Sequence, residues 1–312
     1  MINEVKALIL CNNPIAVPGI KEFLFFGKVG AIGIPKKNKE MKDILERMMA
    51  DSGVPLLLLD KNDYKEKIVQ AIQQNQVTVG LMMTFPFMIT PEILALPARG
   101  FINFHYGLLP QCRGPHPILW HLLNNDAEAG VTVHKVDEGI DTGPVILQEK
   151  IPIAYNDTYG TLQSQLAFLA AKQAANLLKI LSYGTILPAV PQDETKARYF
   201  EMPTAADLTI NWAEMSAQKI ERLVNACNPW NKGAGTTIND WGIGITEVAI
   251  VGECENTDIP PGKIIACNNE AGLLVSTMDN KKLKINIIYT NEGFFSGSRL
   301  AGFQIKAGDS FV

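Results

Sequence analysis

The sequence lacks a long hydrophobic run and any closely paired cysteines. No apolar stretch approaches the roughly 18 residues that a membrane-spanning helix needs. The five cysteines are widely scattered with no Cys-X-X-Cys pair, which argues against a disulfide framework and a thiolate zinc site. The first six residues lack a basic start followed by an apolar stretch, so no secretory signal is expected. We expect a cytoplasmic protein with no membrane partner.

Net charge is also small. The 312 residues carry a formal net charge of −4, so the overall field does not indicate nucleic-acid binding, although a local basic patch would still be compatible with it. Hydrophobic residues make up 47% of the chain and charged residues 19%, which is ordinary for a globular protein. The length is sufficient for two domains.

Three common catalytic signatures are missing. No Gly-X-Gly-X-X-Gly follows the first apolar stretch, so binding of a nicotinamide dinucleotide is unsupported. There is no Gly-X-Ser-X-Gly motif, which disfavours a serine hydrolase. All four histidines lie between positions 105 and 134, but there is no His-Glu-X-X-His motif, and the spacing of His116 and His121 places them off one helical face. We therefore expect no metal site.

Apolar stretches alternate with segments of helical periodicity in the first half of the chain. Expected strands cover residues 5–10, 29–34, 54–59, 77–83 and 100–103, and expected helices cover 20–26, 43–52, 63–74 and 91–96. This alternation predicts an α/β fold with a doubly wound, mostly parallel sheet. A helix over 115–124, two strands over 130–136 and 144–151, and a long helix over 158–183 are expected to follow.

The segment between Leu187 and Pro203 differs in composition from the rest of the chain. It is rich in proline and charged residues and poor in apolar residues. Such a stretch is typical of an interdomain linker. Beyond it, a helix over 212–226 precedes short strands with glycine-rich turns, a pattern that favours a small barrel. We expect an N-terminal domain over 1–187, a linker over 188–205 and a C-terminal open-barrel, OB-like domain over 206–312.

Chemistry-bearing residues concentrate after the strand expected to end at Asn103. Asn103 and His105 stand at positions i and i+2, so on a strand both side chains point to the same side. Open α/β sheets bind ligands at the carboxyl ends of their strands. An amide N–H and a protonated imidazole can stabilise the oxyanion that forms when an amine attacks a carbonyl carbon. A carboxylate such as Asp141 would favour the charged imidazole and could hold a proton-relaying water.

Each of these residues also has a purely structural interpretation. His105 alone could be a local hydrogen-bonding residue at a strand end. Asn103 could cap a turn, and Asp141 could bond its own backbone. On physical grounds alone, the catalytic and the structural interpretations of the set remain equally open.

Several spaced motifs resemble those of the folate-dependent formyltransferase family. The matching segments are Asn103-Phe-His105-Tyr-Gly-Leu-Leu-Pro110, Arg113-Gly114, Gly130-Val-Thr-Val and Asp137-Glu-Gly-Ile-Asp141-Thr-Gly143. Beyond the linker, segments 208–212, 228–230, 272–277 and 307–309 are similar to the C-terminal domain of methionyl-tRNA formyltransferases. The resemblance covers nearly the whole chain.

The resemblance implies 10-formyltetrahydrofolate as the cosubstrate and a primary amine as the acceptor, with no metal. It implies that Asn103 and His105 polarise the formyl oxygen and that Asp141 sets the charge of His105. Arg113 would meet an anionic part of the acceptor or donor, unless it is simply a solvated arginine. The residues implied to border the folate are Phe87, Met88, Ile89, Gly107, Leu108, Leu109, Pro110, Val136, Asp137, Gly139 and Ile140. For Phe87, Met88 and Ile89, packing in the core is an equal alternative.

The sequence departs from the family in ways that bear on the acceptor. Gly107 stands where the family commonly has serine, and the segment 34–43 is short where methionyl-tRNA formyltransferases carry a long basic insertion. Beyond residue 205 there are nine Lys or Arg against twelve Asp or Glu, whereas a tRNA-binding domain should present a basic face. We therefore expect a small amine or nucleotide-linked amino sugar as acceptor, ahead of methionyl-tRNA.

Two other functions share these residues. A 10-formyltetrahydrofolate hydrolase would use the same Asn–His–Asp set with water in place of the amine, so the sequence hardly separates it from a transferase. A non-catalytic folate- or nucleotide-binding protein is disfavoured, because it would have no need of all three residue types.

Overall fold

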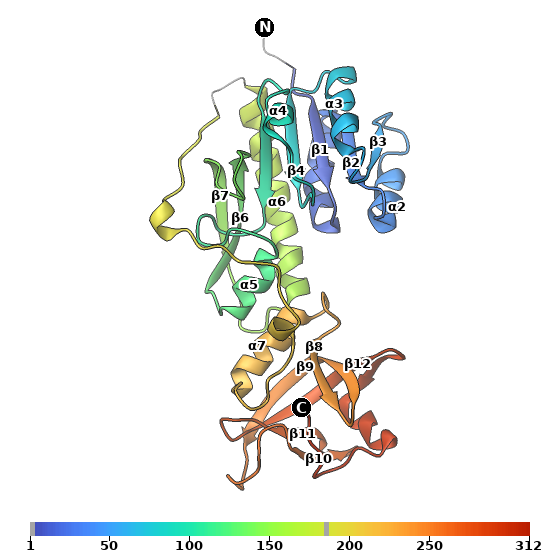
Figure 1. The fold of residues 1–312 in the computed structure, drawn as a ribbon, viewed down its shortest axis with the longest axis vertical. Helices are drawn as coiled ribbons and strands as arrows, with labels where there is room; N and C mark the ends of the chain where they lie inside the picture. Colours follow the sequence, from blue (N-terminus) through green and yellow to red (C-terminus); the bar gives the residue numbers. More distant parts are fainter. Residues whose placement is uncertain (1–3, 184–186) are drawn as a thin grey trace. The chain divides into compact units, whose positions relative to one another are not determined.

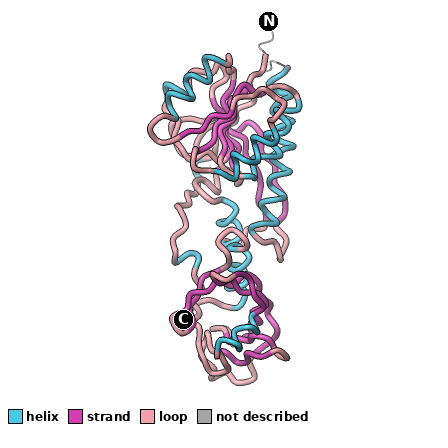
Figure 2. Tube along the Cα trace, turned by 90° about the vertical axis from the view of Figure 1, so that its right-hand side faces the viewer, coloured by secondary structure: helices cyan, strands magenta, loops and turns pink. Residues whose placement is uncertain are grey.

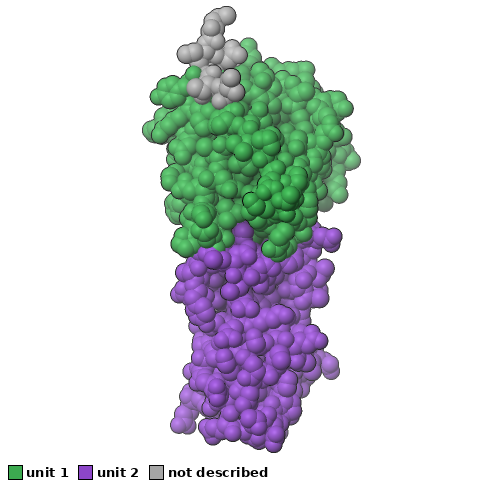
Figure 3. Space-filling view, turned by 90° about the vertical axis from the view of Figure 1, so that its left-hand side faces the viewer, with its two compact units in different colours: residues 1–117, 128–152, 163–200 green, residues 118–127, 153–162, 201–312 purple. Residues whose placement is uncertain are grey.

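The computed structural model describes residues 4–183 and 187–312 of the chain. The chain forms two compact units, coloured separately in Figure 3: one of residues 1–117, 128–152 and 163–200, and one of residues 118–127, 153–162 and 201–312. We call them the N-terminal and the C-terminal unit. The domain boundaries expected from the sequence stay a prediction.

A seven-stranded sheet forms the centre of the N-terminal unit, in the order β3-β2-β1-β4-β5-β6-β7 (Figure 1). Its strands are β1 (Ala7–Cys11), β2 (Val29–Pro35), β3 (Leu56–Leu59), β4 (Val79–Met83), β5 (Phe101–His105), β6 (Glu128–Lys135) and β7 (Val145–Pro152). The first five pair in parallel, and β6 and β7 are antiparallel to their neighbours. The predicted doubly wound, mostly parallel sheet is confirmed.

The central strands are apolar throughout because both faces of the sheet are covered. Every residue of β1 is buried. The surrounding helices are α1 (Val17–Phe25), α2 (Lys39–Met48), α3 (Tyr64–Gln74), α4 (Pro91–Leu94) and the long α6 (Tyr159–Ser182), with the 3₁₀ turns η1 (Pro14–Ala16) and η2 (Glu194–Lys196). The short α5 (Pro117–Leu123) begins where the chain passes into the C-terminal unit.

Several element boundaries differ from the sequence-based expectation, and two of these differences have a clear local reason. Helix α2 begins four residues earlier than expected, because the side chain of Asn38 accepts a hydrogen bond from the backbone N–H of Met41 at 3.0 Å and caps the first turn. Strand β5 continues to His105, because β6 pairs with it and sets Asn103 opposite His134. This longer strand places both predicted catalytic side chains on one rigid element.

The C-terminal unit contains a second sheet, which is antiparallel. Its strands are β8 (Ala234–Ile238), β9 (Trp241–Glu253), β10 (Ile264–Asn268), β11 (Gly272–Ser276), β12 (Lys281–Thr290) and β13 (Gly293–Ser296), accompanied by α7 (Ala217–Cys227), η3 (Ala206–Leu208) and η4 (Gly297–Phe303). The order is β10-β11-β12-β9-β8, with β13 beside β12, and the strands curve around the interior of the unit (Figure 2). This separate sheet agrees with the predicted C-terminal β domain. None of the helices in the described parts of the chain combines the length and apolar character needed to cross a membrane.

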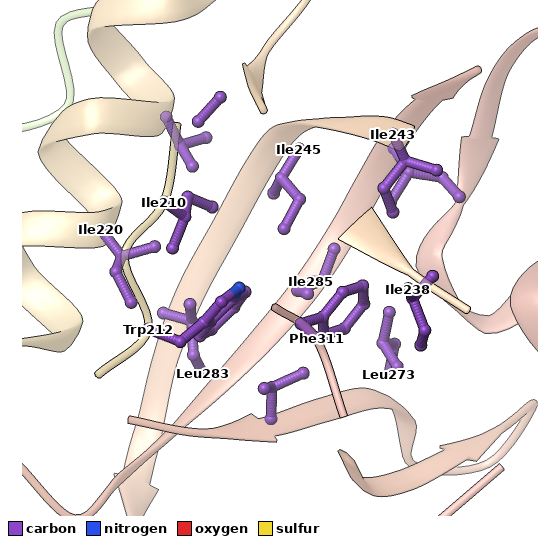
Figure 4. Packing of buried hydrophobic residues seen from close by; sticks show 14 of the residues in the cluster. Ile210, Trp212, Ile220, Ile238, Ile243, Ile245, Leu273, Leu283, Ile285 and Phe311 are labelled. Carbon is purple, nitrogen blue, oxygen red and sulfur yellow. The ribbon is translucent and has the colours of Figure 1, made fainter. Parts of the chain in front are cut away.

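The core of the C-terminal unit is organised around Trp212 (Figure 4). The indole is 4% exposed and stacks on Phe311, with ring centroids 5.4 Å apart and planes 20° apart. Its Nε1–H donates to Thr236 Oγ1 at 2.9 Å, so the only polar atom of the side chain is satisfied inside the core. Trp212 therefore joins the segment before α7 to strand β8.

Replacing Trp212 should destabilise the C-terminal unit. Trp212→Ala is expected to cost about 3–5 kcal/mol, the usual loss when a large aromatic side chain is removed from a core. Trp212→Phe keeps an aromatic ring beside Phe311 and loses the indole hydrogen bond, so its cost should be clearly smaller. Differential scanning calorimetry of the full chain measures both; a parent-like unfolding profile for Trp212→Ala would refute this view of the core.

Candidate active site

The three residues predicted to be catalytic come together at the carboxyl end of β5. Asn103 and His105 lie on that strand, and Asp141 lies in the loop between β6 and β7. The amide Nδ2 of Asn103 donates to Asp141 Oδ1 at 3.3 Å, and His105 Nδ1 lies 3.5 Å from Asp141 Oδ2. The side chain of Asp141 keeps 13% of its surface exposed and that of His105 keeps 7%, so the cluster is largely but not wholly shielded from water.

Asp141 is held as an anion. Burial raises the pKa of a carboxyl group, but the facing charge of His105 and the backbone N–H of Gly114 together hold the pKa of Asp141 well below its usual value. The Gly114 N–H donates to Oδ2 at 3.0 Å. Asp141 also adopts a left-handed backbone conformation, with φ of 55°, which is uncommon outside glycine and frequent at functional sites.

His134 is a member of this cluster that the sequence analysis did not select. Its Nε2 lies 3.1 Å from Asn103 Nδ2 and 3.4 Å from Asp141 Oδ1. Its Nδ1 lies 2.8 Å from the backbone oxygen of Lys135. Because a carbonyl can only accept, Nδ1 carries the hydrogen and Nε2 of the neutral ring accepts from Asn103. The alternation of residues 130–136 was visible in the sequence, but the pairing of β6 with β5 was not.

Both nitrogens of the His105 ring face acceptors. Nε2 lies 2.6 Å from the backbone oxygen of Cys112, and Nδ1 faces the Asp141 carboxylate. Only the doubly protonated imidazolium supplies a hydrogen to each of them. The arrangement therefore favours a positively charged ring, which is the form that can stabilise a developing oxyanion.

Gly107 leaves room for this ring. A Cβ built on Gly107 would lie 2.8 Å from His105 Nε2 and 2.8 Å from the Cβ of Pro117. Separations below about 3.0 Å between such atoms require a shift. The absence of a side chain at Gly107 therefore permits the observed placement of His105 against Cys112.

Most of the residues predicted to border the folate lie on the loops after β4 and β6, which share a hydrophobic cluster. Ile89 belongs to this cluster, and Phe87 and Val136 pack against it from the loops after β4 and β6. The ring of Phe87 lies 4.9 Å from that of Tyr64. In contrast, the side chains of Met88 and Ile140 are 62% and 56% exposed. Phe87, Ile89 and Val136 thus have a packing role, whereas Met88 and Ile140 are accessible.

The remaining predicted folate residues are engaged in local structure. Leu109 donates its N–H to Thr132 Oγ1 at 3.2 Å and accepts from Gln148 Nε2 at 2.8 Å; the peptide bond between it and Pro110 is cis. Leu108 is half-buried beside Gly130. Asp137 Oδ1 accepts from the Gly139 N–H at 3.1 Å and from Thr142 Oγ1 at 2.6 Å, which closes its own loop. The folate contacts of these residues stay a prediction.

Arg113, predicted to contact substrate, is fully buried with 0% exposure. All of its N–H groups have partners inside the N-terminal unit: Gln192, Glu194 and Tyr199. A substrate could contact the guanidinium only by displacing these groups. The observed contacts assign it to an internal network of the N-terminal unit.

The four histidines do not form one centre. His105 and His134 meet at Asp141, whereas His121 pairs with Asp126, with 2.7 Å between Nδ1 and Oδ2, in the C-terminal unit. Across residues 4–183 and 187–312, no group of three or more His, Cys, Asp or Glu residues is arranged to hold a metal ion.

Comparison with known proteins identifies the family. A formyl transferase model matches residues 27–178, and a model of the formyl transferase C-terminal domain matches residues 203–293. The chain belongs to the formyltransferase family and is a formyl-transfer enzyme, as its sequence motifs predicted.

Solved structures show the same fold. WlaRD, a sugar 3N-formyltransferase crystallised with dTDP and 5-N-formyl-THF, is 19% identical with a TM-score of 0.66, over 90% of this chain and 97% of that one. An N-formyltransferase from Helicobacter canadensis, in complex with folinic acid and dTDP-3-aminofucose, is 20% identical with a TM-score of 0.66, over 89% and 98%. HypX from Aquifex aeolicus, with tetrahydrofolic acid, is 15% identical with a TM-score of 0.66, over 96% of this chain and 47% of that one. At these identities the likeness establishes the fold alone.

The low pKa of Asp141 predicts how this carboxyl group responds to pH. Because that pKa is lowered from its ordinary value of 3.8, the carboxyl group should bind a proton only in more acidic solution, and its stabilising contribution should be lost only as the pH falls through that low value. The carboxyl ¹³C resonance of Asp141 should therefore stay constant between about pH 5 and pH 9. A titration step of the carboxyl group itself in that window would show that the cluster does not hold an anion.

Proposed function

We propose that the chain transfers the formyl group of 10-formyltetrahydrofolate to the primary amine of a nucleotide-linked amino sugar. The observation that carries the proposal is that Asn103 and His105, at the end of β5, each place a side-chain nitrogen within 3.5 Å of the Asp141 carboxylate. The family supplies formyl transfer as the reaction. The acceptor class rests on the weak basic character of the C-terminal residues and on the amino-sugar enzymes that share the fold.

The polar cluster suits the charge change of formyl transfer. As the amine nitrogen attacks the formyl carbon, negative charge develops on the formyl oxygen. The Asn103 amide and the His105 imidazolium donate hydrogen bonds to that oxygen, and each such donor is worth about 3–4 kcal/mol. Breaking of the bond between the formyl carbon and N10 then returns the oxygen to a carbonyl, and the amine loses one proton while N10 gains one.

Engagement of the formyl oxygen requires an exchange of hydrogen bonds. The Asn103 amide directs its two hydrogens to His134 Nε2 and Asp141 Oδ1, at 3.1 and 3.3 Å. His105 Nε2 donates to Cys112 at 2.6 Å, so in this proposal that N–H leaves the Cys112 oxygen for the formyl oxygen while Nδ1 continues to face Asp141. One N–H of Asn103 can turn from a weak partner at 3.3 Å to the formyl oxygen at little cost, because Asp141 keeps its hydrogen bond from Gly114.

Asp141 acts in this proposal as a fixed negative charge. A carboxylate whose pKa is well below its usual value is a weak base, so direct removal of the amine proton is not its best role. It stabilises the imidazolium of His105 and orients the Asn103 amide. A water held by its partly exposed carboxylate could still relay the amine proton outward.

The surroundings of the cluster suit a flat pterin ring. The loops after β4 and β6 are anchored in one hydrophobic cluster by Ile89 and Val136. Each loop also presents an exposed apolar side chain, Met88 on one and Ile140 on the other. Contact with an aromatic ligand would cover both side chains and stabilise the complex by removing apolar surface from water. When bound, 10-formyltetrahydrofolate supplies the activated formyl group on N10.

The acceptor can be tested directly. With 10-formyltetrahydrofolate as donor, purified protein should formylate at least one member of a panel of dTDP- and UDP-linked amino sugars. Methionyl initiator tRNA, the second candidate, should react at least tenfold more slowly in kcat/KM. Mass spectrometry of the acceptor measures the product, and a reaction without any amine measures formate release. Faster formylation of methionyl-tRNA than of every sugar would reverse the acceptor order, and formate release at the same rate without amine would identify a hydrolase instead.

A further inference from the structure

Residues 190–200, which we call the strap, run along the segments that carry the catalytic cluster. At one end, Val190 and Val145 exchange two backbone hydrogen bonds, of 2.8 and 2.9 Å. At the other end, the Arg113 N–H donates to the oxygen of Arg198 at 2.9 Å, and the Phe200 N–H donates to the oxygen of Arg113 at 2.9 Å. The strap is thus tied both to the strand that follows Asp141 and to the turn that follows His105, although its sequence predicts a linker.

Arg113 connects the middle of the strap to this turn. Its Nη1 and Nη2 form a bidentate pair with the Glu194 carboxylate, at 2.9 and 2.6 Å. Its Nε and Nη2 both donate to Gln192 Oε1, at 3.1 and 2.9 Å, and Nη1 also donates to the Tyr199 hydroxyl at 2.7 Å. A buried guanidinium with every donor satisfied is rigid, because moving it would leave a charge without partners.

Gln192 extends this network to the backbone of the catalytic carboxylate. Its Nε2 donates to the backbone oxygens of Asp141 and Gly143, both at 2.8 Å. Its other side-chain atom, Oε1, is the one fixed by Arg113. One amide group therefore clamps the loop on both sides of Thr142 and is itself held in a single orientation.

The same network also contacts the side chain of Asp141, through the backbone of Gly114. The Gly114 N–H donates to Asp141 Oδ2. Gly114 has a φ of 99°, and a Cβ there would lie 2.2 Å from the Phe200 oxygen of the strap. This position therefore requires glycine, and the strap lies directly against it. Both the backbone and the carboxylate of Asp141 are set by groups that contact the strap.

We infer that Gln192 and Arg113 are positioning residues for formyl transfer, and that the strap serves the active site through Gln192. Gln192 fixes the left-handed backbone of Asp141, and Arg113 fixes Gln192 and the Gly114 N–H. Together they keep the carboxylate where it faces His105 and Asn103. This inference rests on the proposed function of the Asn103–His105–Asp141 cluster. It assigns roles to residues that touch no reacting atom.

Kinetics of Gln192 variants test the inference. Gln192→Ala should lower kcat by about tenfold to 100-fold, because a shift of about 1 Å in a catalytic group has effects of this size. KM for donor and acceptor should stay within about twofold, since the network contacts neither in the proposed complex. Gln192→Glu keeps an acceptor for Arg113 but has no N–H for the carbonyls of Asp141 and Gly143, so it should lose kcat as Gln192→Ala does. A parent-like kcat for either variant overturns the inference, and so does a rise in KM without a fall in kcat.

Asp193→Ala provides the matched control in the strap. Asp193 accepts from Thr195 and pairs with Lys196, both within the strap. Its removal perturbs the same segment without touching Arg113, Asp141 or Gly143, so kcat should remain that of the parent. A loss of kcat equal to that of Gln192→Ala would show that the strap responds to any disturbance, which would overturn the specific role of Gln192.

Hydrogen exchange separates this inference from the proposed function. The Gly114 amide, which donates to Asp141, should exchange at least tenfold faster in Gln192→Ala than in the parent, whereas amides of β1 should exchange at parent rates. Unchanged exchange at Gly114 would show that the clamp does not hold the carboxylate. If the parent formylated no acceptor, the proposed function would fail while this exchange measurement still decided whether the clamp exists.

Discussion

The contact between the Asp141 carboxylate and its three partners is the interaction on which the chemistry proposed for the N-terminal unit depends. One oxygen receives the Gly114 N–H and faces His105, and the other receives the Asn103 amide. Removing such a charge from water is expensive unless it is surrounded by donors and opposite charge. Here those partners overcome the effect of burial, so that a largely buried carboxyl group is an anion.

The residues of this cluster come from segments far apart in the chain, and the strand and the loop that carry them are fixed in different ways. Strand β5 fixes Asn103 and His105 through its pairing with β4 and β6. Asp141 lies outside the strands, in a loop, and is held there by hydrogen bonds from Gly114 and Gln192. A site for acyl transfer needs this rigidity, because preorganised donors stabilise a transition state without reorganising during the reaction.

Sequence reasoning succeeded where the signal is local. Alternating apolar stretches predicted the parallel sheet, and the i, i+2 spacing of Asn103 and His105 placed them on one side of a strand. It missed features that depend on long-range pairing: His134 enters the cluster only because β6 lies antiparallel to β5. Gln192 and Glu194 stand in a stretch whose composition is that of a linker, and nothing near them in the sequence reveals that their partner is Arg113.

We expect the charge of Asp141 to be needed for the chemical step and not for the folding of the chain. The most direct measurement is the single-turnover rate of formyl transfer in Asp141→Asn, with donor and acceptor both saturating. The expected rate is at least about 100-fold below that of the parent, consistent with the loss of electrostatic stabilisation in an active site, in a protein whose circular dichroism is unchanged. A rate equal to that of the parent would contradict it.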